Sequence, residues 1–108
     1  MYNPPTKKQL AKIPGLYSQD GVEDKKIYMK FFLGGWTWYV AEFDGKDLFF
    51  GLVVSPLEPR GEWGYFSLRE LATVKQGPFR VDRDLYDITV YKPKKVSDIK
   101  ELRGRGVL

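Results

Sequence analysis

The sequence of 108 residues contains neither cysteine nor histidine. Without cysteine, the chain can form no disulfide, no thiolate nucleophile and no cysteine-ligated zinc site, which fits a reducing compartment. Without histidine, it also lacks the side chain that most often serves as a general base and as a metal ligand. These absences exclude much of catalytic chemistry. We therefore expect a protein that is not an enzyme and that holds no metal or cofactor.

Long apolar runs are missing as well. No stretch approaches the roughly eighteen apolar residues of a membrane-spanning helix, and residues 1–5 lack the layout of a secretory signal. The composition is 43% hydrophobic and 16% aromatic, which is typical of a globular chain, and the length suits one domain. We expect a single cytoplasmic domain without membrane contact, with flexible ends at residues 1–5 and 103–108.

The net charge of +4 is unevenly distributed along the chain. Residues 1–13 carry three lysines and no acid, and residues 92–108 carry six cations against two acids. The residues between them hold nine cations and twelve anions. Basic ends suit contact with a polyanion such as nucleic acid, but terminal lysines also keep aromatic-rich domains soluble. Both interpretations stay open at this point.

Residues 27–54 show the alternation of a three-stranded antiparallel meander. Its first strand has one fully apolar face, and its second, residues 36–43, is apolar on both faces. The third, residues 48–54, is a near-continuous apolar run of the kind found in central strands. Tight turns are predicted at Gly34-Gly35 and at residues 44–47.

Prolines, glycines and one capping sequence mark the flanks of this meander. Residues 55–61 contain two prolines and a glycine, which predicts a loop, and residues 62–66 then rejoin the sheet as a fourth strand. Near the start of the chain, Thr6 and Gln9 have the spacing of a capping box. A short N-terminal helix is therefore expected, ending at Pro14-Gly15.

A second helix is predicted over residues 67–75. Ser67 stands at an N-cap position with Glu70 three residues later, and an amphipathic stretch follows. Gly77-Pro78 is a stop signal of the usual glycine-then-proline form.

The last part of the chain is less regular. Residues 79–81 and 85–91 are predicted as extended segments around a charged break, and residues 97–102 as a short C-terminal helix. Together, these elements predict an α+β fold whose antiparallel sheet has four to five strands.

The chain contains the strings YVAEFDGKDLFFGLV, EWGYFSLREL and DLYDITVYKP, which begin at Tyr39, Glu62 and Asp84. Together they resemble DUF2958, a bacterial family of small proteins of unknown function. The resemblance covers about residues 16–98, and its most specific part lies within the second string. It implies a short intracellular protein of a kind often carried on plasmids and other mobile elements. It supplies no catalytic residue.

Strand aromatics are candidates for a partner surface. Exposed, they would offer an apolar patch to another protein or a stacking platform to single-stranded nucleic acid. Strand aromatics more often fill the core, and on these strands only Lys30 places a cation among them. The candidate partner surface comprises Trp36, Trp38, Trp63 and Tyr65.

Basic residues near the C-terminus are candidates for phosphate contacts that do not read base sequence. The carboxylates of the chain match no catalytic or metal-binding motif and are expected to form ion pairs. The candidate phosphate contacts are Lys92, Lys94, Lys95, Lys100, Arg103 and Arg105.

Two hypotheses about function follow. In the first, the chain is a non-enzymatic accessory protein of a bacterial mobile element, an adaptor or inhibitor that binds another protein. In the second, it binds nucleic acid through its basic terminal segments, with sequence-independent phosphate contacts. The first is preferred, since accessory proteins of mobile elements often act in this way.

Overall fold

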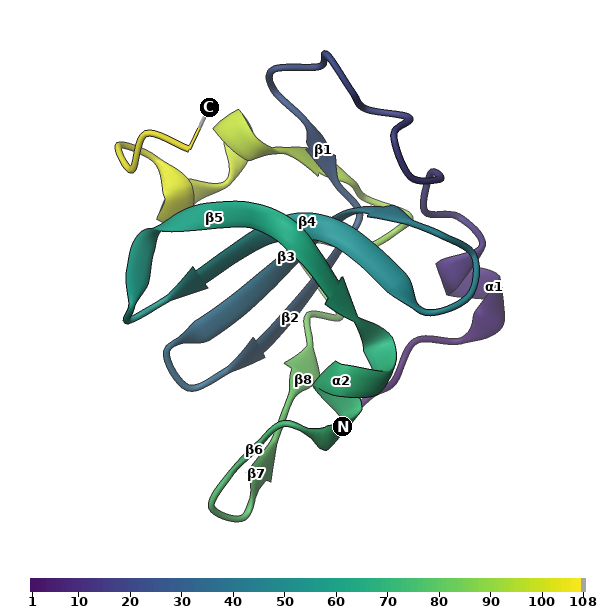
Figure 1. Ribbon diagram of the computed structural model, residues 1–108, viewed down its shortest axis with the longest axis vertical. Helices are drawn as coiled ribbons and strands as arrows, with labels where there is room; N and C mark the ends of the chain where they lie inside the picture. Colours follow the sequence, from purple (N-terminus) through teal and green to yellow (C-terminus); the bar gives the residue numbers. More distant parts are fainter. Residues whose placement is uncertain (108) are drawn as a thin grey trace.

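A five-stranded antiparallel sheet organises the protein in the computed structural model, which describes residues 1–107 (Figure 1). The strand order is β5-β4-β3-β2-β8, and the predicted α+β fold is confirmed. The strands are β2 (Met29–Leu33), β3 (Trp36–Phe43), β4 (Leu48–Ser55), β5 (Glu58–Ser67) and β8 (Asp82–Arg83).

Shorter elements surround this sheet. Two pairs of two-residue strands lie outside it, β1 with β9 and β6 with β7, and the latter pair forms a projecting hairpin (Figure 1). No helix among residues 1–107 is long and apolar enough to cross a membrane. The shorter elements are α1 (Lys7–Leu10), β1 (Lys26–Ile27), α2 (Leu68–Thr73), β6 (Lys75–Gln76), β7 (Phe79–Arg80), β9 (Lys94–Lys95) and the 3-10 turns η1 (Val96–Asp98) and η2 (Lys100–Leu102).

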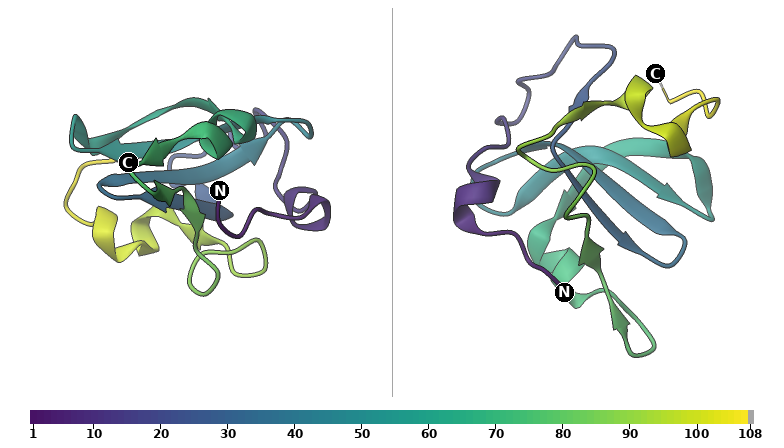
Figure 2. Two further views of the ribbon diagram at one scale, coloured as in Figure 1. Left: turned by 90° about the horizontal axis from the view of Figure 1, so that it is seen from below. Right: turned by 180° about the vertical axis from the view of Figure 1, so that it is seen from behind.

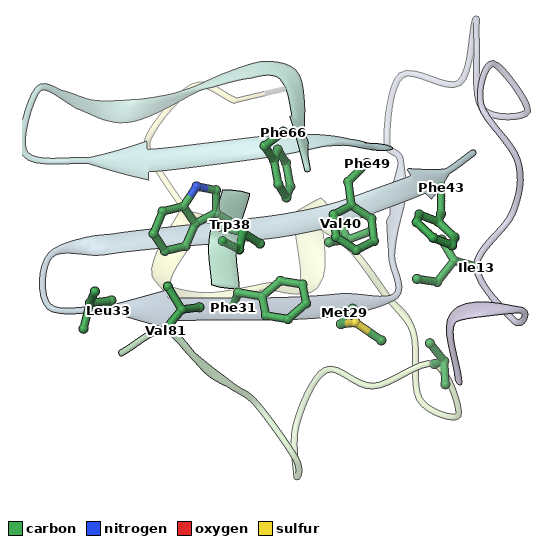
Figure 3. Close-up of a cluster of buried hydrophobic side chains, with 12 residues drawn as sticks. Ile13, Met29, Phe31, Leu33, Trp38, Val40, Phe43, Phe49, Phe66 and Val81 are labelled. Carbon is green, nitrogen blue, oxygen red and sulfur yellow. The ribbon is translucent and has the colours of Figure 1, made fainter. Parts of the chain in front are cut away.

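Each face of the sheet carries its own hydrophobic cluster. In the first, the Phe49 ring lies 5.0–5.8 Å from the rings of Phe31, Phe43 and Phe66 (Figure 3). In the second, the C-terminal segment covers the other face, beneath the sheet in the left view of Figure 2. The first cluster is Ile13, Met29, Phe31, Leu33, Trp38, Val40, Phe43, Phe49, Phe66, Leu71, Val81 and Val90. The second is Ile27, Tyr39, Ala41, Leu52, Ile88, Val96, Ile99 and Leu102.

The predicted first strand of the meander is split at Tyr28. Ile27 belongs to β1 and pairs with Lys94 of β9, whereas Met29 begins β2 and pairs with Val40 of β3. Both Ile27 and Met29 are buried, as the alternation predicted, but they pack in different clusters. Because of this split, Ile27 and Met29 contribute buried side chains to opposite faces of the sheet.

The loop predicted over residues 55–61 is wrong. β4 continues to Ser55 and β5 already begins at Glu58, so only Pro56-Leu57 makes the connection. Pro59 is tolerated within β5 because β5 is an edge strand, where a missing backbone N–H breaks no ladder. The strand predicted at residues 62–66 is therefore the second half of a longer one.

The two predicted helices form at their capping residues. Thr6 and Gln9 make both bonds of the capping box, at 3.1 and 2.9 Å. Ser67 accepts from the N–H of Glu70 at 2.9 Å, so the second helix begins where predicted.

The predicted end of the second helix is wrong. The helix stops at Thr73, and residues 75–80 form the β6–β7 hairpin. Gly77 has a φ of 58°, which suits a tight turn. Gly77-Pro78 is therefore a hairpin turn and not a helix stop.

The extended segment predicted over residues 85–91 is also wrong. The Asp84 carboxylate accepts from the N–H groups of Tyr86, Asp87 and Ile88 at 2.9–3.1 Å and bends the chain into a turn. The fifth strand of the sheet is instead β8, inside the charged stretch that was predicted as a break. The predicted C-terminal helix is present as the two 3-10 turns.

Glu101 fastens the C-terminal segment to the sheet. Its Oε1 accepts from Lys30 Nζ at 2.8 Å and from the Tyr39 hydroxyl at 2.9 Å. Burial, and then the nearby Glu101 carboxylate, raise the pKa of Tyr39. Burial of Glu101 opposes its ionisation, but the hydrogen bonds it accepts outweigh burial, so the pKa of Glu101 lies below its usual value of 4.5.

This shift predicts a pH-dependent contribution to stability. A carboxyl whose pKa is lower in the folded than in the unfolded state stabilises the fold above the unfolded pKa, and the contribution disappears as the pH falls through the folded value. We expect Glu101→Gln to lower the free energy of unfolding near neutral pH, and the gap from wild type to close below pH 4.5. Urea unfolding across this range measures it, with the exposed Glu62→Gln as control. A gap that persists at the lowest pH would contradict the prediction.

Candidate functional site

The four aromatic candidates do not share one surface. Strand register places Trp38 beside Val53 and Glu62, whereas Trp63 lies beside Leu52 and Tyr39. Because side chains alternate along a strand, Trp38 and Trp63 point to opposite faces of the sheet. Trp36 accompanies Trp38, and Tyr65 accompanies Trp63.

The face that carries Trp63 is largely covered by the protein itself. The Trp63 indole donates from Nε1 to the carbonyl oxygen of Val107 at 3.3 Å, and the Lys25 ammonium lies 5.5 Å from its ring centroid. The ring also stacks on Phe50 with centroids 5.8 Å apart. Tyr65, at 54%, is an exposed ring on this face, and Phe32, at 37%, stands on the same face at the β2 side of the sheet. Trp63 therefore offers no free face for a stacked base.

The face that carries Trp36 ends in an apolar hollow of about 390 Å³. Trp36 stacks on Trp38 with centroids 5.8 Å apart and planes 23° apart. Trp36 is 38% exposed and Trp38 only 6%, so the buried indole supports the exposed one. The hollow is lined by Leu33, Trp36, Trp38, Val74, Lys75 and Gln76.

A second hollow of about 370 Å³ adjoins the first, and the two share Leu33 and Gln76. It carries three more exposed rings, of which Phe79 is the most open at 61%. We call the two hollows together the hairpin groove, because the β6–β7 hairpin forms one side of both. The second hollow is lined by Tyr2, Phe32, Leu33, Gly34, Gln76, Phe79, Arg80 and Asp82.

Two contacts hold the β6–β7 hairpin in place. The Tyr2 hydroxyl donates to the carbonyl oxygen of Pro78 at 3.3 Å. The Gln76 side chain lies over Gly34, where an added Cβ would come within 2.5 Å of Gln76 Oε1. Gly34 also has a φ of 56°, so both turn geometry and space favour glycine. The groove is therefore preformed between two tight turns.

The rim of the hairpin groove is basic. Lys75 and Arg80 are cross-strand partners in the hairpin, and neither forms an ion pair within residues 1–107. The Arg80 guanidinium donates only to the carbonyl oxygens of Gly77 and Phe79 in this part of the chain. Asp82, the one acid of the lining, is engaged by the side chain of Asn3 at 3.0 Å. An anionic group would find two cations there.

The six basic candidates lie apart from the groove. They sit towards the C-terminus, at the opposite end of the molecule from the β6–β7 hairpin (Figures 1 and 2). Two of them have partners: Lys94 forms an ion pair with Asp87 at 2.5 Å, and Arg105 donates to the carbonyl oxygen of Pro59 at 2.6 Å. The remaining four, Lys92, Lys95, Lys100 and Arg103, are exposed.

The most buried carboxylate has a structural role. Glu42 is 2% exposed and accepts from the N–H groups of Tyr17 at 2.9 Å and Gln19 at 2.7 Å. It thereby fixes the loop that precedes β1. Within residues 1–107, no three ligating side chains gather in a group that would hold a metal ion.

Sequence patterns identified Trp36 and Trp38 but missed Phe32 and Phe79. Phe32 lies on the face of β2 opposite Phe31 and Leu33. Phe79 follows a turn that was predicted as the end of a helix. A Gly-Pro pair between two short polar and aromatic stretches is also a hairpin signal, and it would have brought Phe79 to attention.

Comparison of the chain with protein-family models, with curated proteins and with solved structures finds no match. The resemblance to DUF2958 therefore stays a prediction.

Proposed function

We propose that this protein is a non-enzymatic binding module that docks on another protein through the hairpin groove, as an adaptor or inhibitor. The observation that carries the proposal is the exposed Trp36 ring, held over the buried Trp38 at the mouth of an apolar hollow. Protein interfaces concentrate their binding energy in a few aromatic and arginine side chains beside well-packed pockets. Adjoining exposed rings are uncommon on a monomer without such a role.

The charge of the rim indicates the kind of partner. Lys75 and Arg80 have no carboxylate partner in residues 1–107, and they flank hollows whose walls are mainly apolar. Complementary charge steers association and fixes the register of a bound segment. The partner is therefore an acidic protein segment that carries an apolar or aromatic anchor. The setting on a bacterial mobile element rests on the resemblance to DUF2958 alone.

Nucleic acid is the weaker candidate for this surface. A single-stranded platform needs aromatic rings along a continuous basic track. The hairpin groove has the rings but only two cations, and the basic C-terminal residues lie at the other end of the molecule.

A peptide-display selection tests the proposal. Random peptides selected on the intact protein should share an aromatic or leucine anchor flanked by aspartate or glutamate. Trp36→Ala should weaken binding of the selected peptides by about tenfold or more, since truncated hot-spot residues cost this much or more. Tyr65→Ala, an exposed aromatic on the opposite face, is the matched control and should leave binding unchanged. Fluorescence anisotropy of labelled peptides gives both affinities.

Charge reversal provides an independent measurement. The double variant Lys75→Glu, Arg80→Glu should bind the selected acidic peptides more weakly than wild type. The difference in affinity should grow as the salt concentration is lowered, because attraction between rim and peptide becomes repulsion. Peptides that bind Trp36→Ala as well as they bind wild type would overturn the proposal. The proposal would also be overturned if short single-stranded DNA displaced the peptides and bound the Trp36→Ala variant more weakly than wild type. That result would assign the groove to nucleic acid.

A further inference from the structure

A third hollow, of about 540 Å³, lies between the loop that precedes β1 and the paired strands β1 and β9. It is separate from the hairpin groove and shares no residue with it. The polar side chains in its wall are Ser18, Gln19, Asp24, Lys26, Tyr28 and Lys95.

Two of these side chains are lysines placed directly opposite each other. Lys26 of β1 and Lys95 of β9 are cross-strand partners, and both are exposed. Neither has a carboxylate within ion-pair distance in residues 1–107. Like charges directly opposite each other destabilise a strand pair. The repulsion falls on a ladder of only two residues per strand, so it is poorly offset by other pairings.

The acceptors of this hollow are already engaged. The Gln19 amide oxygen accepts from the N–H of Lys26 at 2.7 Å, and its nitrogen donates to the carbonyl oxygens of Lys26 and Ala41. Both oxygens of Asp24 accept from Ser97, one from its N–H at 3.0 Å and one from its hydroxyl at 2.6 Å.

The donors, in contrast, remain available. The ammonium groups of Lys26 and Lys95 and the hydroxyl of Tyr28 make no hydrogen bond within residues 1–107. The Ser18 hydroxyl is not among them, because it already donates to the carbonyl oxygen of Gly15. A hollow with two free ammonium groups and a free hydroxyl donor suits an oxyanion.

We propose that this hollow binds the phosphate group of a phosphomonoester, bridged between Lys26 and Lys95. The two ammonium groups attract a phosphate dianion, an attraction that the Asp24 carboxylate of the same wall reduces, and the Tyr28 hydroxyl provides a third donor. Lys95 is one of the six basic candidates near the C-terminus, and the β1–β9 pairing places it beside Lys26. The sequence did not indicate this neighbour. The volume of about 540 Å³ leaves space for the organic group attached to the phosphate.

Inorganic phosphate is the first probe. Amide shifts in two-dimensional NMR, titrated with phosphate against chloride at equal ionic strength, should move at β1 and β9. Lys26→Ala and Lys95→Ala should each weaken phosphate binding by about tenfold, as expected for loss of a charge-assisted hydrogen bond. Lys100→Ala removes an exposed lysine outside the hollow and should have no effect. Asp24→Asn removes the one negative charge of the wall and should tighten binding.

Further probes identify the source of the phosphate. A nucleoside 5′-monophosphate should bind at least as tightly as inorganic phosphate, and the same nucleoside without phosphate should not bind. Single-stranded DNA without a terminal phosphate is the competing ligand. If it binds wild type, and Lys26→Ala weakens its binding as much as that of phosphate, the site recognises backbone phosphodiesters and the assignment to a monoester is overturned. Equal weakening by Lys26→Ala and Lys100→Ala would show non-specific charge attraction and overturn the site itself.

Discussion

Gly51→Ala is expected to destabilise the protein by about 3 kcal/mol or more, or to prevent folding. Gly51 lies in β4, directly opposite Val40 of β3, at the β-bulge that separates Val40 from Glu42. A Cβ at this position would lie 1.9 Å from the carbonyl oxygen of Tyr39 and 3.2 Å from the Cα of Val40. Both are backbone atoms of a central strand, so the clash cannot be relieved by turning a side chain.

Gly64→Ala is the matched control for this prediction. Gly64 pairs directly with Gly51 across the β4–β5 ladder, but a Cβ added there meets no atom within 4 Å. The change should be neutral or slightly stabilising, because alanine restricts the unfolded chain more than glycine does. Urea unfolding of both variants measures the difference. Equal stability of the two would show that the approach of β3 to β4 at the bulge does not constrain residue 51.

The meander was predictable because its signal is local. Apolar residues alternate along β2, the strand β3 is apolar on both faces, and Gly34-Gly35 and Gly45 mark the two turns, so the strands of the meander follow from neighbouring residues alone. The β6–β7 hairpin was not predictable in this way. Its residues follow a real helix cap at Ser67, and the Gly77-Pro78 pair fits either a helix stop or a hairpin turn. Contacts with Tyr2 and Gly34, far away in the sequence, support the hairpin.

The four candidate aromatics are divided between the two faces of the sheet because side chains alternate along each strand. Whether Trp38 and Trp63 share a face depends on the register of three consecutive strands, and each β-bulge or turn of different length reverses it. Bulges occur at Val40/Glu42 and at Val53/Ser55, and nothing in the local sequence specifies either. The aromatic composition therefore supplied candidate rings but could not show which of them would be neighbours.

The loop that precedes β1 shows a related limit. It has no periodicity, yet it is ordered by two buried polar side chains, Gln19 at 8% exposure and Glu42 at 2%. A glutamate in a strand ordinarily marks a solvent-facing position. Here its carboxylate is turned inward and serves the backbone of a segment more than twenty residues away. Since that segment also forms one wall of the proposed phosphate hollow, the fold of the loop and the site depend on the same contact.

Glu42→Gln is expected to lower the free energy of unfolding by about 2–4 kcal/mol. The carboxylate accepts from two backbone N–H groups, of Tyr17 and Gln19, at separate oxygens. A glutamine amide has one oxygen, so its nitrogen would face an N–H donor and leave that donor buried without an acceptor. Tyr17 has a φ of 70°, which is unfavourable for a residue with a side chain and is maintained by these contacts.

The Glu42→Gln effect should be concentrated in the loop, and hydrogen exchange distinguishes this from a general loss of stability. Amide exchange at Tyr17 and Gln19 should accelerate well beyond that of β3, because the loop can open while the sheet stays paired. Glu62→Gln makes the same chemical change at an exposed position of β5 and should alter stability by less than about 0.5 kcal/mol. Unchanged exchange at Tyr17 and Gln19 in the Glu42 variant would mean that other contacts hold the loop. In that case the Glu42→Gln variant should still bind phosphate. If the loop does open, both the affinity for phosphate and the protection of the Gln19 amide from exchange should fall.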